Sequence, residues 1–401
     1  MQSKKRIIFD MGLNIIAVAI PTLFLQLLIL PSLAGHMSDS RYGLLVTLLA
    51  MLNVLPATLG NVLNNIRLLQ NNRYEEKGLE GDFNLLLLIM AIIDVVVVSA
   101  FTVSYASSVT IIDVVLIVLV SLEWIAKEYY IVAFRLKINY LAIFINNILQ
   151  VVGYVIGYFV FLKTGKWQTI YLFGYFVSLV YIFLHCDLWK EKLIKTSLFK
   201  ETTWQSLLLF LASVLNRVIT YADKILIYPL LGGAVVSVYY AATVFGKVVS
   251  LAISPVNAVA LTYLAKVQKK SSSVFKTALI AGSCTCVVGY LACIIISRPV
   301  LTLLYPQFVD QAMQYIYITT GTTVVYALIT IVDPFILKFF DMKWQIALNG
   351  GTAFVYVLLC LTFLHFWGLM GFCFGALLTN IFKFCFMLFI YTKCREKNTP
   401  I

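Results

Sequence analysis

The stretch LNRVITYADKILIYPLLGG, residues 215–233, places three charged side chains inside an apolar helix of spanning length. Arg217, Asp223 and Lys224 fall within two turns of one another, although 61% of the whole chain is hydrophobic. An ionised side chain inside a bilayer is energetically costly, so such residues commonly mark a path for a polar substrate or ion. The rest of the chain has to show what that substrate is.

The composition of the chain indicates a polytopic membrane protein. Its 401 residues have a mean hydropathy of +0.94, and only 12% of them are charged. No soluble fold of this length buries so much apolar surface. The net charge of +12 is also typical of nucleic-acid binding, and the placement of the basic residues decides between the two interpretations.

Apolar runs long enough to cross a bilayer recur about twelve times along the chain. They cover about 8–30, 42–64, 84–105, 110–134, 139–162, 168–185, 204–227, 234–262, 275–296, 312–337, 344–366 and 369–391. We therefore predict an all-α polytopic membrane protein, with about twelve transmembrane helices in two six-helix lobes around a central cavity. The N-terminal lobe is expected at 1–190, a cytoplasmic linker at 191–203 and the C-terminal lobe at 204–401.

The basic residues favour one orientation in the membrane. If the N-terminus is cytoplasmic, about 21 of the 30 basic residues fall in cytoplasmic segments and about four fall on the opposite side. Cytoplasmic loops carry an excess of Lys and Arg, so we predict that both termini lie in the cytoplasm. This distribution explains the positive net charge without nucleic acid.

A weak internal repeat relates the two halves. Residues 33–59 (LAGHMSDSRYGLLVTLLAMLNVLPATL) resemble residues 231–259 (LGGAVVSVYYAATVFGKVVSLAISPVNAV). In both, a glycine turn precedes a tyrosine and then an apolar helix that contains a proline. Six helices per half predict a parallel repeat, an arrangement in which transporters place a site between two lobes. Chance similarity between apolar helices is the alternative.

Three cations are expected to reach the central slab of the bilayer. Arg217 lies roughly 20 Å from Trp204, which we place at the cytoplasmic interface. Lys247 lies a similar distance along its own helix, and Lys383 about 15 Å inside the membrane. With Lys224 they form a predicted cationic site for a phosphate or pyrophosphate group. The alternative for Lys224 is a local pair with Asp223 near the outer helix end, with the lysine reaching the interface.

Buried acids and amides complete the set of candidate site residues. The ion-coupling candidates, for H⁺ or Na⁺, are Asp94, Glu123, Glu128 and Asp223. A structural pair between Glu123 and Lys127, four residues apart on one helix, is an alternative. The sugar-contact candidates are Asn53, Asn146, Asn147 and Gln150. Hydrogen bonding between helices is equally consistent with each amide.

Sequence signatures of soluble enzymes are absent. The chain has no phosphate-binding loop, no dinucleotide-binding glycine motif and no HExxH. Its three histidines are scattered near helix ends. We therefore expect a protein that is not an enzyme and that has no cofactor and no bound metal. Energy is expected from an ion gradient or from the substrate gradient.

Two motifs resemble a known family. LAGHMSDSRYGLL (33–45) and YADKILIYPLLGGAVVSVYYAA (221–242) are similar to glycine-turn motifs of O-antigen and capsular polysaccharide repeat-unit flippases. These flippases belong to the multidrug/oligosaccharidyl-lipid/polysaccharide (MOP) exporter superfamily. The resemblance implies alternating-access transport of an undecaprenyl-pyrophosphate-linked oligosaccharide from the inner to the outer leaflet of the bacterial inner membrane. It also implies polysaccharide polymerase and chain-length proteins as partners.

Three other functions remain open. A cation-coupled multidrug antiporter of the same superfamily would have a cavity richer in acidic than in basic residues. A membrane-embedded polysaccharide polymerase or ligase usually needs a long outer loop, whereas the outer loops predicted here are short. A flippase for a peptidoglycan precursor commonly has extra helices.

Overall fold

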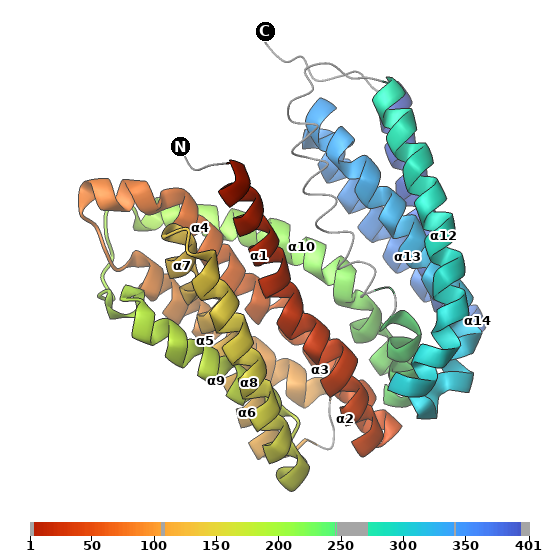
Figure 1. Ribbon diagram of the computed structural model, residues 1–401, viewed down its shortest axis with the longest axis horizontal. Coiled ribbons are helices and arrows are strands. Elements are labelled where there is room, and N and C mark those ends of the chain that lie inside the picture. Colours follow the sequence, from red (N-terminus) through yellow and green to blue (C-terminus); the bar gives the residue numbers. More distant parts are fainter. Residues whose placement is uncertain (1–3, 106–108, 245, 247–271, 341, 394–401) are drawn as a thin grey trace. The chain divides into compact units, whose positions relative to one another are not determined.

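The protein folds into helices throughout the part of the chain that the structure describes. This computed structural model describes residues 4–105, 109–244, 246, 272–340 and 342–393 (Figure 1). No strand occurs within these ranges. The prediction of an all-α polytopic fold is therefore confirmed.

Each predicted apolar run overlaps a helix. The helices in the first half are α1 (Lys4–Phe24), η1 (Leu25–Ile29), α2 (Leu30–His36), α3 (Asp39–Val54), α4 (Pro56–Lys77), α5 (Asp82–Tyr105), α6 (Ile111–Tyr130), α7 (Val132–Leu136), α8 (Tyr140–Thr164) and α9 (Gln168–His185). The remaining ones are η2 (Leu188–Lys190), α10 (Phe199–Leu231), a helix over Gly233–Val244, α12 (Ser272–Leu304), η3 (Pro306–Phe308), α13 (Val309–Phe339) and α14 (Met342–Lys393). Most of the run predicted at 234–262 lies outside the described residues.

Eight helical segments within the described ranges are long and apolar enough to cross a membrane, or nine if the two halves of α10 count as one span. Helix α6 is not among them because it carries four charged side chains. Helix α10 bends by 50° between Phe199–Leu215 and Arg217–Leu231. The charged stretch that the sequence singled out therefore follows directly after a bend.

The chain divides into two compact units. Unit 1 comprises residues 1–33 and 44–229, and unit 2 comprises residues 34–43 and 230–401. Helix α10 thus belongs almost entirely to unit 1, whereas the sequence analysis placed it in the C-terminal lobe. The functional division at 191–203 stays a prediction.

Unit 1 is built around close helix contacts. Helix α8 packs on α1 and α9, and α6 packs on α4, α5 and α9. A Cβ atom added at Gly153 in α8 would lie 2.4 Å from the carbonyl oxygen of Phe173 in α9, and one at Gly157 would lie 2.5 Å from that of Thr169. Two glycines four residues apart thus let the α8 and α9 backbones touch, as small residues do in membrane bundles.

The break between α3 and α4 lies at a proline. Leu55 separates the two helices, and Pro56 begins α4. Because proline lacks an N–H, the carbonyl of Leu52 cannot receive its usual helical hydrogen bond. The last carbonyls of α3, Asn53 among them, lie at a helix end, where intrahelical partners are missing.

Unit 2 contains α12, α13 and α14, with α13 packed against the other two. Helix α14 is two helices joined at Trp367–Gly368, where Gly368 has φ 56°. This left-handed conformation costs glycine less than any other residue, so the chain can reverse direction here. The two arms correspond to the last two predicted spans.

The two repeat stretches meet at their helix starts within unit 2. A Cβ at Gly233 would lie 2.4 Å from the Ser40 carbonyl oxygen, and the Ser237 hydroxyl donates to the Asp39 carbonyl at 2.6 Å. The rings of Tyr42 and Tyr240 lie edge to face with centroids 6.0 Å apart. The tyrosines of both repeats and the turn glycine of the second therefore serve close packing of one repeat against the other.

Candidate functional site

Arg217 lies at the bend of α10 and reaches the broken end of α3. Its Nη1 donates to the carbonyl oxygen of Asn53 at 3.3 Å. One turn on, the Tyr221 hydroxyl donates to Asn53 Oδ1 at 3.2 Å, and Asn53 Nδ2 donates to Leu49 O at 2.8 Å. Two residues of α10 thus satisfy polar groups that the helix break exposes. Within the described residues, Arg217 has no carboxylate partner.

Lys224 forms the local pair that the sequence left open as an alternative. Its Nζ lies 2.5 Å from Asp223 Oδ2, and its side chain is buried. A buried ammonium that is neutralised by the adjacent carboxylate has little net charge left for a substrate phosphate. Lys224 is therefore a weaker candidate for anion binding than Arg217.

Lys383 lies in a polar group of unit 2. Its Nζ donates to Asn349 Oδ1 at 3.4 Å, across the two arms of α14. Gln345 donates to Asp333 Oδ1 at 3.4 Å, and Asp333 of α13 is close enough to act electrostatically on Lys383. Lys247, the fourth predicted cation, lies outside the described residues.

Two of the predicted ion-coupling carboxylates are buried in unit 1. Asp94 of α5 accepts a hydrogen bond from the Ser121 hydroxyl of α6, while its Oδ1 has no hydrogen-bond partner among the described residues. Glu123 Oε2 is buried and likewise lacks a partner there. Glu128 instead pairs with Lys127 at 3.2 Å, so the alternative pairing of Lys127 with Glu123 is not the one formed.

The predicted amides of α8 point into the interior of unit 1. Asn146, Asn147 and Gln150 are all buried. The Ser178 hydroxyl of α9 donates to Asn146 Oδ1 at 3.0 Å, and Gln150 donates to the Tyr154 hydroxyl. Asn146 Nδ2 and Gln150 Oε1 have no partner within the described part of the chain. Asn146 thus joins α8 to α9, Gln150 bonds within α8, and both keep one polar atom for a water or ligand.

Unit 1 also contains a buried polar network that was not predicted from the sequence. Arg67 of α4 forms a bidentate pair with Glu191, with Nη–Oε distances of 2.7 and 2.9 Å, and both side chains are largely buried. Asn84 of α5 donates to the carbonyls of Leu188 and Glu191 at 2.9 and 3.0 Å. Arg67 and Glu191 are 124 positions apart, so no local pattern could join them.

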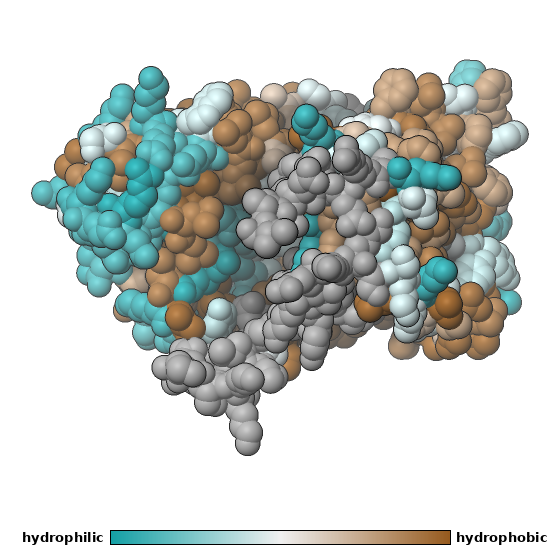
Figure 2. Space-filling model, turned by 90° about the horizontal axis from the view of Figure 1, so that it is seen from above, coloured by the Kyte–Doolittle hydropathy of each residue, from teal (hydrophilic) through white to brown (hydrophobic). Residues whose placement is uncertain are grey.

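The same network fixes the start of α10. Asp82 accepts hydrogen bonds from the backbone N–H of Thr196, at 2.7 Å, and from its hydroxyl. The Tyr74 hydroxyl lies 2.8 Å from Asp82 and 2.7 Å from Thr202. Figure 2 shows hydrophilic side chains gathered on the left, where Figure 1 has the end of α4. The connection between α9 and α10 is therefore held against unit 1 by side chains.

Metal-ligating groups do not cluster in the described part of the chain. No set of three or more His, Cys, Asp or Glu side chains is close enough there to hold a metal ion. The site residues that remain are separate polar groups on α5, α6, α8, α10 and α14, together with Asn53 at the end of α3. Such groups can bind an anion or exchange a proton within an otherwise apolar bundle.

This helical architecture matches those of several solved membrane transporters. A multidrug resistance MATE family transporter of the MOP superfamily, in an inward-facing conformation, matches at a TM-score of 0.67 and 13% identity over 94% of this chain and 97% of the other. The lipid II flippase MurJ matches at a TM-score of 0.69 and 13% identity over 96% and 86%. A Vibrio cholerae MATE transporter, VcmN, matches at a TM-score of 0.58 and 10% identity over 96% and 94%.

These structural matches establish the fold, and eight helical segments within the described ranges have the length and composition of membrane spans. No protein-family model matches the chain, and no curated protein matches it. The solved structures with this fold include drug transporters and a lipid flippase, so the substrate has to be argued from the residues.

Proposed function

We propose that the chain is a flippase that moves an undecaprenyl-pyrophosphate-linked oligosaccharide repeat unit across the bacterial inner membrane. The product would feed O-antigen or capsule assembly by a polysaccharide polymerase and chain-length proteins. The shared fold with MurJ, whose described activity is the flipping of lipid II, supports a lipid-linked substrate. Alternating access of the two lobes would move the sugars while the lipid tail stays in the bilayer.

The observation that carries this proposal is the state of Arg217. A guanidinium has five N–H donors, and one of those of Arg217 bonds to the Asn53 carbonyl. No carboxylate neutralises it among the described residues, so its charge and remaining donors stay available. Guanidinium groups bind phosphate oxygens in a forked geometry, which fits a pyrophosphate. Lys383 and Lys247 are further candidate cations, and Asn53, whose carbonyl contacts Arg217, is a candidate sugar contact.

A cation-coupled multidrug antiporter is the second candidate. The buried carboxylates of Asp94 and Glu123, each with one oxygen that lacks a partner within the described residues, favour it. Carboxylates of this kind inside a membrane commonly exchange protons or bind cations. The matching MATE structures have the same fold. In a flippase the same two residues would couple transport to H⁺ or Na⁺.

Two variants of Arg217 separate anion binding from helix capping. We expect Arg217→Gln to keep a donor for Asn53 but to lose the charge, and Arg217→Lys to keep the charge. In a host that lacks the gene, lipid-linked oligosaccharide should accumulate on the cytoplasmic leaflet. Arg217→Lys should restore at least about a tenth of the surface glycan, and Arg217→Gln almost none, because a charged hydrogen bond contributes about 1.5–3 kcal/mol.

The same strains decide between the two functions. Arg298→Gln, a change of an exposed arginine paired only loosely with Asp310 at 3.9 Å, should restore surface glycan fully. Normal surface glycan with Arg217→Gln at wild-type expression would contradict the anion site. Normal glycan in the deletion strain itself, together with drug sensitivity that Asp94→Asn or Glu123→Gln also produces, would instead support the antiporter.

A further inference from the structure

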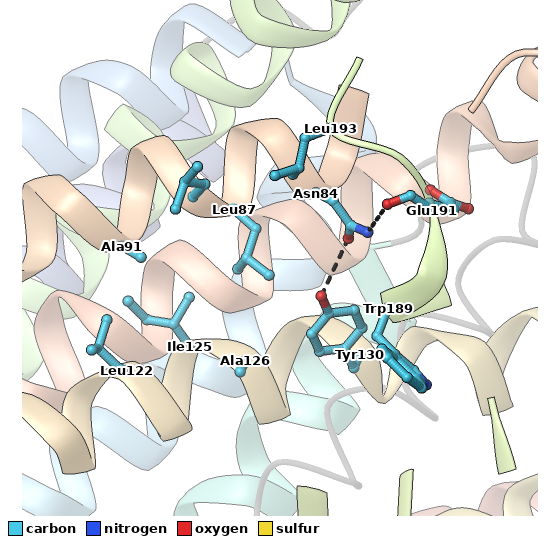
Figure 3. Close-up of a pocket in the computed structure, with 11 residues that line it drawn as sticks. Asn84, Leu87, Ala91, Leu122, Ile125, Ala126, Tyr130, Trp189, Glu191 and Leu193 are labelled. Atoms are coloured by element: carbon cyan, nitrogen blue, oxygen red, sulfur yellow. Dashed lines mark hydrogen bonds between the residues drawn. The ribbon is translucent and has the colours of Figure 1, made fainter. Parts of the chain in front are cut away.

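An apolar groove runs along unit 1 beside the connection between α9 and α10. It has a volume of about 330 Å³, which lies at the lower end of the range for ligand pockets. Figure 3 shows Leu87 and Ala91 of α5 facing Leu122 and Ala126 of α6, with Trp189 and Leu193 of the connection at one end. All of these residues belong to unit 1.

The polar groups at the end of the groove are already engaged. Asn84 donates to two carbonyls of the connection and accepts from the Tyr130 hydroxyl at 3.3 Å. Glu191 binds Arg67 through both carboxylate oxygens. A polar ligand would therefore find few free partners here, whereas a hydrocarbon chain would gain burial against the leucine and alanine walls.

The groove is continuous with a surface that faces lipid in a spanning helix. Leu88, which lines it, is 47% exposed. Ile89 and Ile92, which follow it on the same helix, are 40% and 58% exposed. An 18-residue stretch of helix α5 has a mean hydropathy of 2.7, and only 22% of that stretch is buried inside the protein. An acyl chain can thus enter from the bilayer without crossing a polar barrier.

Cations and an aromatic ring flank the end of the groove. Lys190 Nζ lies 5.5 Å from the Trp189 ring centroid, and Lys195 Nζ lies 5.0 Å from that of Phe199. Lys190 also pairs with Asp187 at 2.5 Å, and the Lys190 ammonium lowers the pKa of that carboxyl. Lys192 and Lys195 are exposed and form no ion pair within the described residues. Tryptophan beside lysines is typical of the headgroup level of a bilayer.

We propose that this groove and the connection, residues 186–198, bind an anionic glycerophospholipid of the bilayer. One acyl chain occupies the space between α5 and α6. The phosphate lies at Lys190 and Lys192, with Trp189 at the level of the ester groups. A lysine near an anionic membrane surface strengthens lipid attraction by about fivefold, which makes the site selective for anionic over zwitterionic lipid. The bound lipid would stabilise the connection against α5 and α6.

Photo-crosslinking with a defined lipid tests this site. The full chain is reconstituted in nanodiscs that contain phosphatidylglycerol with a diazirine near the end of one acyl chain. After irradiation, the labelled peptides are identified by mass spectrometry. We expect label on residues 84–91 and 122–126, and competition by unlabelled phosphatidylglycerol at least about fivefold stronger than by phosphatidylcholine.

Matched variants assign the label to the groove. Ala91→Trp with Ala126→Trp fills it and should lower labelling at least fivefold, whereas Ala100→Trp, at an exposed position on the same helix, should not. Lys190→Ala with Lys192→Ala and Lys195→Ala should remove the preference for phosphatidylglycerol, whereas Lys163→Ala with Lys276→Ala and Lys343→Ala should keep it. Equal competition by both lipids, or unchanged labelling of a monodisperse filled variant, would overturn the proposal.

Discussion

At the scale of single residues, the buried charges of unit 1 are largely matched to partners that the structure supplies. Arg67 and Glu191 neutralise one another, and the Arg67 guanidinium also lies 4.7 Å from the Phe83 ring centroid. Lys224 is paired with Asp223. Arg217 differs because a backbone carbonyl, not a carboxylate, meets it. This contrast is why the functional proposal depends on Arg217 and not on the number of cations.

Removing one member of the Arg67–Glu191 pair is expected to destabilise unit 1 strongly. Glu191→Ala leaves a buried guanidinium without its counter-charge, which costs about 3–5 kcal/mol. The melting temperature of the purified protein in detergent should therefore fall clearly.

Glu201 supplies the control for this prediction. It forms a similar bidentate pair with Arg73, but both side chains are about half exposed, so Glu201→Ala should leave the melting temperature nearly unchanged. Equal melting temperatures of Glu191→Ala and wild type would show that the connection is not fixed by this pair.

At the scale of elements, breaks and close contacts place the polar groups. Pro56 interrupts the helix between α3 and α4. Arg217 and Tyr221, which follow the bend of α10, contact Asn53 at the end of α3. For Pro56 the structure shows a defined break whose end is hydrogen-bonded by α10.

The contact between α8 and α9 is expected to tolerate no side chain at Gly153. Gly153→Leu would drive atoms into the Phe173 carbonyl and separate the helices, which we expect to cost about 1–3 kcal/mol. A lower melting temperature and faster proteolysis within residues 140–185 would be the measured result.

Gly350 is the matched control for that change. It lies in α14 with no atom within 4 Å of an added Cβ, so Gly350→Leu should leave stability unchanged. If the two leucine variants were equally stable, the close approach of α8 and α9 would be wrong.

At the scale of the whole molecule, the twelve apolar runs predicted from the sequence imply an even number of membrane crossings. Both termini should then lie on the cytoplasmic side, as the basic residues indicate. A fluorescent-protein fusion after residue 401 should fluoresce. An alkaline phosphatase inserted at the connection 165–167 should be active, because this connection is expected outside.

Insertion of the same reporters into the connection 186–198 provides the complementary test. Fluorescence without phosphatase activity is expected there, since four of the basic residues of the chain fall between 190 and 200. Phosphatase activity at this position would reverse the predicted orientation and place the lysine-rich connection on the outer side.

Sequence by itself determined the helical class, the approximate span limits and the candidate charges of this protein. Apolar length is a local property, because a segment in lipid must satisfy its own backbone hydrogen bonds. The weak repeat was also predicted from the sequence, and Tyr42 of its first copy meets Tyr240 of its second in unit 2.

Only the tertiary structure decided which charges are neutralised. Arg67 meets Glu191, and Arg217 meets Asn53, which is 164 positions away. Lys127 forms an ion pair with Glu128, although Glu123 lies one turn away on the same helix. The grouping of α10 with unit 1 was decided in the same way. Such pairings depend on distances between side chains that packing brings together, and hydropathy and spacing along one helix carry no information about them.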